Sequence, residues 1–168
     1  MLLKSGSAGT SPRRVGSLTH IEERTAARLV LLDEAKRILL FLHNDGHGRT
    51  FWATPGGGLE PGETLQQAAV REAAEELGVE TADLVQLWSG HARFKFANRA
   101  VSQTETFFLV TQQVDLTRLE LGELHRVEGI IDVRWWSLDE IQKSDALIFP
   151  ADLVDKLREH LPALGKRP

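Results

Sequence analysis

Cysteine and tyrosine are both absent from this chain of 168 residues. Without cysteine, the protein has no disulfide bonds, no thiolate metal ligands and no cysteine nucleophile. Long apolar runs are absent as well, since no stretch approaches the roughly 18 apolar residues of a membrane-spanning helix. The apolar start at Met1 to Leu3 is too short for the core of a secretion signal. We therefore expect a cytoplasmic protein that makes no membrane contact.

An excess of positive charge is also missing. Lys and Arg together number 20 against 24 Asp and Glu, which gives a formal net charge of −4. This balance provides no general attraction to nucleic acid or to anionic membranes. A small-molecule partner is therefore favoured over a nucleic acid.

The apolar content is sufficient for one folded domain. Hydrophobic residues make up 42% of the chain, and its length fits a single domain with a sizeable core. Residues 1–19 are rich in Ser, Gly and Thr and predict a flexible tail. Residues 20–168 are then expected to form the domain, and they contain no internal repeats.

Apolar runs bounded by polar turns predict strands, and amphipathic runs with capping residues predict helices. We expect a turn at residues 98–100 and a flexible loop at residues 116–128. Predicted strands cover residues 25–32, 37–42, 51–55, 84–96, 105–114 and 130–136. Short helices are expected from Ser137 to Glu140 and after Pro150. Strands interleaved with helices indicate an α/β fold.

The most informative stretch covers residues 57–79 and reads GGLEPGETLQQAAVREAAEELGV. It begins with glycine-rich turns and continues into a predicted helix. Thr64 and Gln67 have the spacing of a capping box, which places the helix start there. Gly78 follows the last periodic residue and is a natural helix end.

Three glutamates crowd one arc of this helix. Glu72, Glu75 and Glu76 are spaced i, i+3 and i+4, and like charges at this spacing repel each other. A hard divalent cation such as Mg²⁺, which binds through carboxylate oxygens, offsets that repulsion. The alternative is an ordinary solvated acidic face.

The complete pattern resembles the Nudix box. Gly57 is followed after five residues by Glu63, and after seven more by the run from Arg71 to Val79, in which only Ala73 is a weak match. The resemblance implies a Nudix α/β/α sandwich with a mixed β-sheet. It also implies hydrolysis of a nucleoside diphosphate linked to another moiety, by attack of water on phosphorus, with Mg²⁺ as cofactor and Mn²⁺ as a possible substitute.

The resemblance assigns roles to the box residues. Glu72, Glu75 and Glu76 become metal ligands together with the backbone carbonyl of Gly57. One of the glutamates, Glu72 before the others, is the candidate general base.

Arg71 would orient a carboxylate of the cluster, and Glu63 would tie the glycine loop to the helix through Arg71. A purely structural pair is the alternative for these two residues. Many Nudix proteins also use an acid outside the box, in the loop before the last strand, and Glu128 is the candidate, followed by Glu123. Glu105 is a third option. Each of these acids has an ordinary solvated or structural role as its alternative.

The substrate is narrowed mainly by exclusion. The proline of the ADP-ribose subgroup, the tyrosine of the diadenosine polyphosphate subgroup and the upstream signature of the coenzyme A subgroup are all missing. What remains resembles the MutT-like group, which acts on nucleoside triphosphates, including oxidised ones. Cationic side chains would meet phosphates and aromatic rings would stack on the base, although solvated charges and packed rings are the alternatives. The predicted substrate residues are Arg28, Trp52, Arg93, Phe94 and Glu105, with Arg24, Lys95, Phe96 and Arg99 as further candidates. His43 and His47 are interpreted as surface or substrate-mouth residues rather than metal ligands.

Two competing functions stay open. An RNA 5′-pyrophosphohydrolase would need a basic channel for the strand, which an acidic chain disfavours. A non-catalytic nucleotide-binding regulator would be expected to lack some of the box acids, all of which are present here. A homodimer is a further expectation, since many Nudix proteins are dimers.

Overall fold

The computed structural model describes residues 21–80, 83–96, 99–112, 114, 122 and 126–162. The predicted tail at residues 1–19 lies outside this part of the chain. Most of the loop predicted at residues 116–128, including Glu123, also lies outside it.

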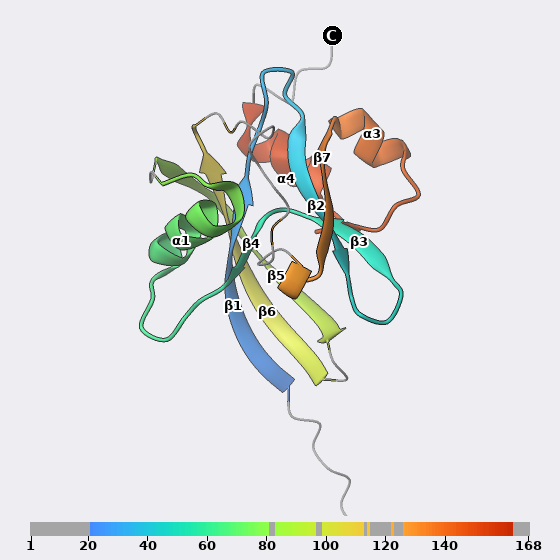
Figure 1. Ribbon diagram of the computed structural model, residues 1–168. Coiled ribbons are helices and arrows are strands. Elements are labelled where there is room, and N and C mark those ends of the chain that lie inside the picture. Colours follow the sequence, from blue (N-terminus) through green and yellow to red (C-terminus); the bar gives the residue numbers. More distant parts are fainter. Residues whose placement is uncertain are drawn as a thin grey trace, which may run out of the picture.

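Two four-stranded sheets form the framework (Figure 1). In the first sheet, β1 and β6 run parallel and the other pairs are antiparallel. The second sheet has one parallel pair, β3 with β8. The first sheet has the order β4 (Gly56–Gly58), β1 (Ile21–Val30), β6 (Arg99–Val110), β5 (Leu84–Phe96), and the second the order β7 (Ile130–Trp136), β2 (Ile38–Asn44), β3 (Thr50–Ala53), β8 (Ile148–Phe149). The predicted mixed α/β fold is confirmed, with two mixed sheets in place of one.

The box helix forms as predicted. Helix α1 (Leu65–Leu77) begins after Thr64, whose side chain and that of Gln67 complete the capping box. Gly78 ends the helix in the left-handed conformation, with φ at 66°. The short helix α3 (Leu138–Lys143) begins with a second capping box, and α4 (Leu153–His160) follows a cis bond between Phe149 and Pro150. No helix in the described ranges is both long and apolar enough to cross a membrane.

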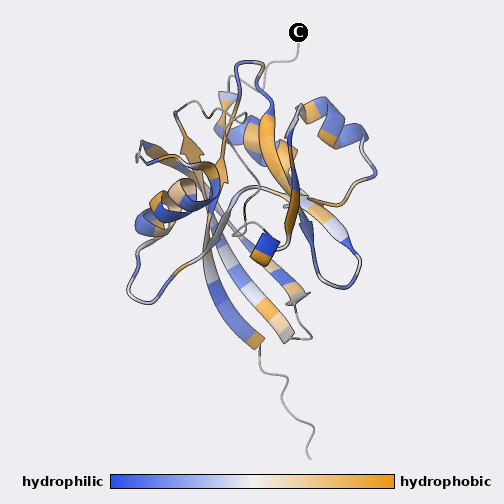
Figure 2. Ribbon diagram, viewed as in Figure 1, coloured by the Kyte–Doolittle hydropathy of each residue, from blue (hydrophilic) through white to orange (hydrophobic). Residues whose placement is uncertain are grey.

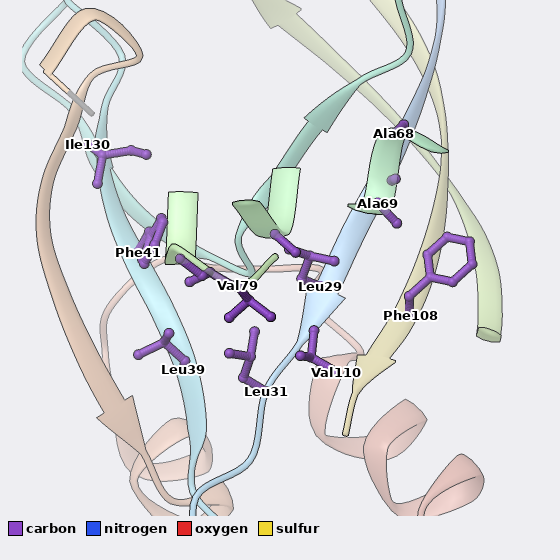
Figure 3. Packing of buried hydrophobic residues seen from close by; sticks show 13 residues of the cluster. Leu29, Leu31, Leu39, Phe41, Ala68, Ala69, Val79, Phe108, Val110 and Ile130 are labelled. Carbon is purple, nitrogen blue, oxygen red and sulfur yellow. The ribbon is translucent and has the colours of Figure 1, made fainter. Parts of the chain in front are cut away.

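Two apolar clusters cover the two faces of the first sheet. Leu29 and Phe108 from this sheet meet Phe41 of β2 and the alanines of α1 in the first cluster (Figure 3). Phe107 and Trp88 meet the buried leucines of α4 in the second cluster. Figure 2 shows hydrophilic residues along the lower half of β1, beyond these clusters.

Four features of the sheets differ from the prediction. Strand β1 begins at Ile21 rather than residue 25, and β6 begins at Arg99 rather than residue 105. The two extensions pair with each other, Ile21 with Ala100 onward, so backbone hydrogen bonds hold segments whose side chains show no apolar pattern. Strands β4 and β8 were not predicted, because three glycines and a two-residue strand carry no periodicity.

Candidate active site

The glycine strand β4 lies between β1 and α1 and brings both to the site. Ala27 pairs with Gly57 and Arg28 pairs with Gly56. A Cβ on Gly56, whose φ is 122°, would lie 2.2 Å from the carbonyl oxygen of Ala27. A Cβ on Gly57 would lie 2.4 Å from Oε1 of Glu72. Only glycine therefore allows this strand to contact β1 on one side and a carboxylate of the helix on the other.

Two carboxylates of the box are buried beside this strand. Glu72 is 5% exposed and Glu76 is 2% exposed, whereas Glu75 lies at the surface. The backbone N–H of Gly56 donates a hydrogen bond to Glu76. Burial raises the pKa of Glu72, and burial with the nearby charge of Glu72 raises the pKa of Glu76 to about 8. The pair therefore retains protons at a pH where ordinary glutamates have lost them.

Glu128, predicted from the loop before β7, lies close to this pair. It is exposed, and its negative charge contributes to the raised pKa of both Glu72 and Glu76. Gly129 fixes its position, since the N–H of Asn44 donates to the Gly129 carbonyl at 2.8 Å. The structure therefore brings the predicted extra acid to the box acids.

Arg71 joins the glycine segment to the acids. Its guanidinium donates to both carboxylate oxygens of Glu63, at 2.9 and 3.0 Å, and to the carbonyl of Gly58 at 2.9 Å. It also donates to Glu72 at 2.8 Å and to Glu75 at 3.1 Å. Hydrogen bonding to Glu63 lowers the pKa of that carboxyl group and raises the pKa of Arg71. The predicted contact between Glu63 and Arg71 is therefore present.

The predicted substrate residues lie in different places. Arg28 and Glu105 pair with each other at 2.8 Å rather than standing apart. On β5, the register with β6 places Phe94 on the same sheet face as Glu105, and Arg93 on the opposite face. Phe94 is 38% exposed. The structure thus brings Phe94, and not Arg93, to the face that carries the Arg28–Glu105 pair.

Trp52 was a substrate candidate with a packed ring as its alternative, and the structure places it in the core. It is 9% exposed and packs edge-on against Trp136, with the ring centroids 5.2 Å apart. Its ring belongs to the second apolar cluster. Because successive residues of a strand face opposite sides of the sheet, Phe51 points away from the apolar cluster that contains Trp52.

His43, Phe51 and Phe149 form an aromatic group whose histidine is within the influence of the Arg28 charge. His43 stacks on Phe51 with centroids 5.2 Å apart, and Phe149 meets Phe51 edge-on at 5.6 Å. Phe149 is 45% exposed. Burial, followed by the positive charge of Arg28, lowers the pKa of His43 to about 4, so the imidazole is neutral at pH 7. The sequence pointed to His43 alone, since Phe149 is about a hundred positions away and no local pattern links it.

The box residues fit a hard divalent cation by their chemistry. Among the described residues, no three Asp, Glu or His side chains converge on one ion position in the present arrangement. Arg71 and the Gly56 N–H instead hold the carboxylates of Glu72 and Glu76. Two buried carboxylates with raised pKa values are nevertheless the oxygen ligands that Mg²⁺ and Mn²⁺ prefer, and a cation would relieve their repulsion.

The chain is similar in sequence and in fold to known proteins. Residues 22–157 match the family model described as NUDIX domain. The chain is 30% identical to "Putative mutator protein MutT4" of Mycobacterium tuberculosis, over 94% of this chain and 66% of that protein, just under two thirds of its length. It is 31% identical to the oxidized purine nucleoside triphosphate hydrolase of Danio rerio, over 76% of this chain and 79% of that protein. A NUDIX hydrolase from Nitrosomonas europaea superposes with a TM-score of 0.58 at 26% identity, over 87% and 92% of the two chains.

Proposed function

We propose that this chain, which belongs to the NUDIX domain family, hydrolyses a nucleoside triphosphate to a monophosphate and pyrophosphate. Mg²⁺ is the proposed cofactor, with Mn²⁺ as a substitute. The observation that carries the proposal is the buried Glu72–Glu76 pair against the glycine strand. The D. rerio relative is named as an oxidized purine nucleoside triphosphate hydrolase, which supports the same substrate class.

Each acid has a proposed task in the reaction. Glu72, Glu76 and the carbonyl of Gly57 would hold the cation, with Glu75 at the exposed side of the set. When bound, the cation would neutralise charge on the phosphate oxygens and favour ionisation of the attacking water. Glu72 or Glu128 would accept the proton of this water as it attacks phosphorus and the bridging oxygen leaves.

Arg71 and Glu63 support this arrangement without touching the substrate. Arg71 is bonded to Glu63 and to the Gly58 carbonyl, so its remaining donors reach Glu72 and Glu75 from a fixed position. The guanidinium charge stabilises the ionised form of Glu72, which both a ligand and a base require.

We assign base recognition to the aromatic group of His43, Phe51 and Phe149. The exposed ring of Phe149 offers a stacking surface, and stacking on an aromatic ring contributes about 1–3 kcal/mol per base. The charge of Arg28 acts on His43, and Arg28 itself donates to the carbonyl of Gly56. A base bound at this aromatic group would therefore lie near Gly56, the first residue of the glycine strand. Phe94 is a second candidate for the same contact.

The test is hydrolysis across a panel with Mg²⁺ or Mn²⁺ at mildly alkaline pH. The panel contains ordinary and oxidised purine nucleoside triphosphates, nucleotide sugars, ADP-ribose, dinucleoside polyphosphates and triphosphorylated RNA. The expected result is pyrophosphate and a monophosphate from one triphosphate, and at least a 100-fold lower rate for Glu72→Gln. Preference for triphosphorylated RNA would support the RNA hydrolase instead. Nucleotide binding without any turnover would support the non-catalytic regulator.

A further inference from the structure

Arg28 and Glu105 form a largely buried ion pair beside the glycine strand. Arg28 Nε donates to Glu105 Oε1 at 2.8 Å, and the two side chains are 19% and 13% exposed. The side-chain amide of Gln103, a residue only 4% exposed, donates to the same oxygen at 2.9 Å. Removing one partner of such a pair leaves the other charge buried without compensation. Glu105 therefore compensates the charge of Arg28 and holds this side chain in its position.

The pair contacts the metal-site backbone through Arg28. The NH1 group of Arg28 donates to the carbonyl of Gly56 at 2.8 Å. This carbonyl belongs to the peptide unit that joins Gly56 to Gly57, whose own carbonyl is the proposed ligand. The N–H of Gly56 donates to Glu76. Gly56 is thus held by Arg28 at its carbonyl and by Glu76 at its amide.

We propose that Glu105 is a positioning residue for the metal site, which holds Arg28 on the Gly56 carbonyl and keeps its guanidinium away from the carboxylate of Glu76. This inference rests on the proposed metal-dependent function. Arg28 and Glu76 bind the same residue from its two sides, since Arg28 donates to the Gly56 carbonyl and the Gly56 N–H donates to Glu76. Without Glu105, the guanidinium of Arg28 would be free to turn to the carboxylate of Glu76, which binds the same glycine, and would compete there with a cation. This role differs from the metal ligand or base that the sequence left open for Glu105.

A double-mutant cycle on the full chain separates these roles, with Mn²⁺ affinity measured by calorimetry. Glu105→Ala should weaken Mn²⁺ binding about tenfold or more, the range found for residues that support metal ligands. Glu105→Gln keeps an oxygen that accepts from Arg28 and should restore most of the affinity. Adding Arg28→Met to Glu105→Ala should return the affinity to that of Arg28→Met alone, because the competing cation is gone. In turnover, Glu105→Ala should lower kcat with little change in KM.

Asp33→Ala is the matched control, since it breaks the Arg37–Asp33 pair of 2.7 Å in the turn between β1 and β2. Its Mn²⁺ affinity should equal that of the wild type. Wild-type affinity in Glu105→Ala would overturn the proposal and leave only a structural pair. An equal loss from Glu105→Ala in the Arg28→Met background would overturn it too, because Glu105 would then act on the metal directly. The titration needs no turnover, so an absence of hydrolysis would refute the proposed function separately.

Discussion

Glu76→Gln is the sharpest test of the buried acid pair. The substitution keeps the shape of the side chain and an oxygen that can accept from the N–H of Gly56, and it replaces the other carboxylate oxygen by an uncharged NH2 group. Glu76 is 2% exposed, so a side chain of a different size would destabilise the close-packed site. Glutamine has nearly the same size and shape as glutamate and avoids this effect. We expect the variant to fold, and we expect its hydrolysis to fall at least about 100-fold, because a proposed metal ligand is lost.

The same substitution should change the pH dependence of stability in the absence of metal. Burial and the charge of Glu72 raise the pKa of Glu76 from 4.5 to about 8 in the folded protein. The folded state therefore binds this proton more tightly than the unfolded chain. The resulting stabilisation is complete below the unfolded pKa, and it is lost as the pH rises from about 4.5 to about 8. At 1.36 kcal/mol per pKa unit, the loss is of the order of 5 kcal/mol.

Urea unfolding in EDTA between pH 5 and pH 8 measures this loss. The wild type should lose stability across the range, and Glu76→Gln should lose much less of it, so the variant should be the more stable protein at pH 8. Glu80→Gln removes an exposed carboxylate just beyond α1 and should follow the wild type at every pH. If the stabilities of wild type and Glu76→Gln changed in parallel with pH, the raised pKa of Glu76 would be refuted. Wild-type turnover of Glu76→Gln with Mg²⁺ would refute the ligand assignment.

Three further substitutions probe the groups around the pair. Gly57→Ala places a Cβ 2.4 Å from Oε1 of Glu72, so the carboxylate must move, and kcat should fall about 100-fold. Gly129→Ala puts an alanine at φ 76° with its Cβ 2.7 Å from the carbonyl oxygen of Asn44. It should cost about 1–2 kcal/mol in urea unfolding and reduce turnover to the level of Glu128→Ala. Phe149→Ala removes the exposed stacking ring and should raise KM about 5- to 150-fold, from about 1–3 kcal/mol of stacking, with kcat within threefold of the wild type.

Local signals explain why the box helix was predictable. Thr64 and Gln67 satisfy the first backbone N–H groups, and Gly78 adopts the conformation that ends a helix, so each boundary has its own chemical cause within a few residues. The spacing of Glu72 and Glu76 then follows from the helix geometry. Their burial could not be read from it, because it depends on a glycine strand packed against the helix.

The parts that the sequence did not predict depend on contacts between distant segments. Strand β4 consists of three glycines, whose pairing with β1 leaves no side-chain pattern. Phe51 and Phe149 meet only because β3 and β8 pair in parallel. The sequence could not decide between the two interpretations of Trp52 for a related reason, because a large ring before the box can face the core or the site and only the strand register decides.

Mg²⁺ should stabilise the folded protein, and the effect should grow with pH. The pKa of Glu76 is raised to about 8, so at pH 5 a cation must displace its proton, whereas as the pH rises towards 8 the carboxylate ionises and a cation relieves the charge repulsion between Glu72 and Glu76. At a free Mg²⁺ concentration 100 times its dissociation constant, linkage gives about 2.7 kcal/mol. The rise in melting temperature on adding Mg²⁺ should therefore be larger at pH 8 than at pH 5, and it should shrink in Glu76→Gln. An equal rise in wild type and variant would show that the cation binds elsewhere, and the buried pair would then need another explanation.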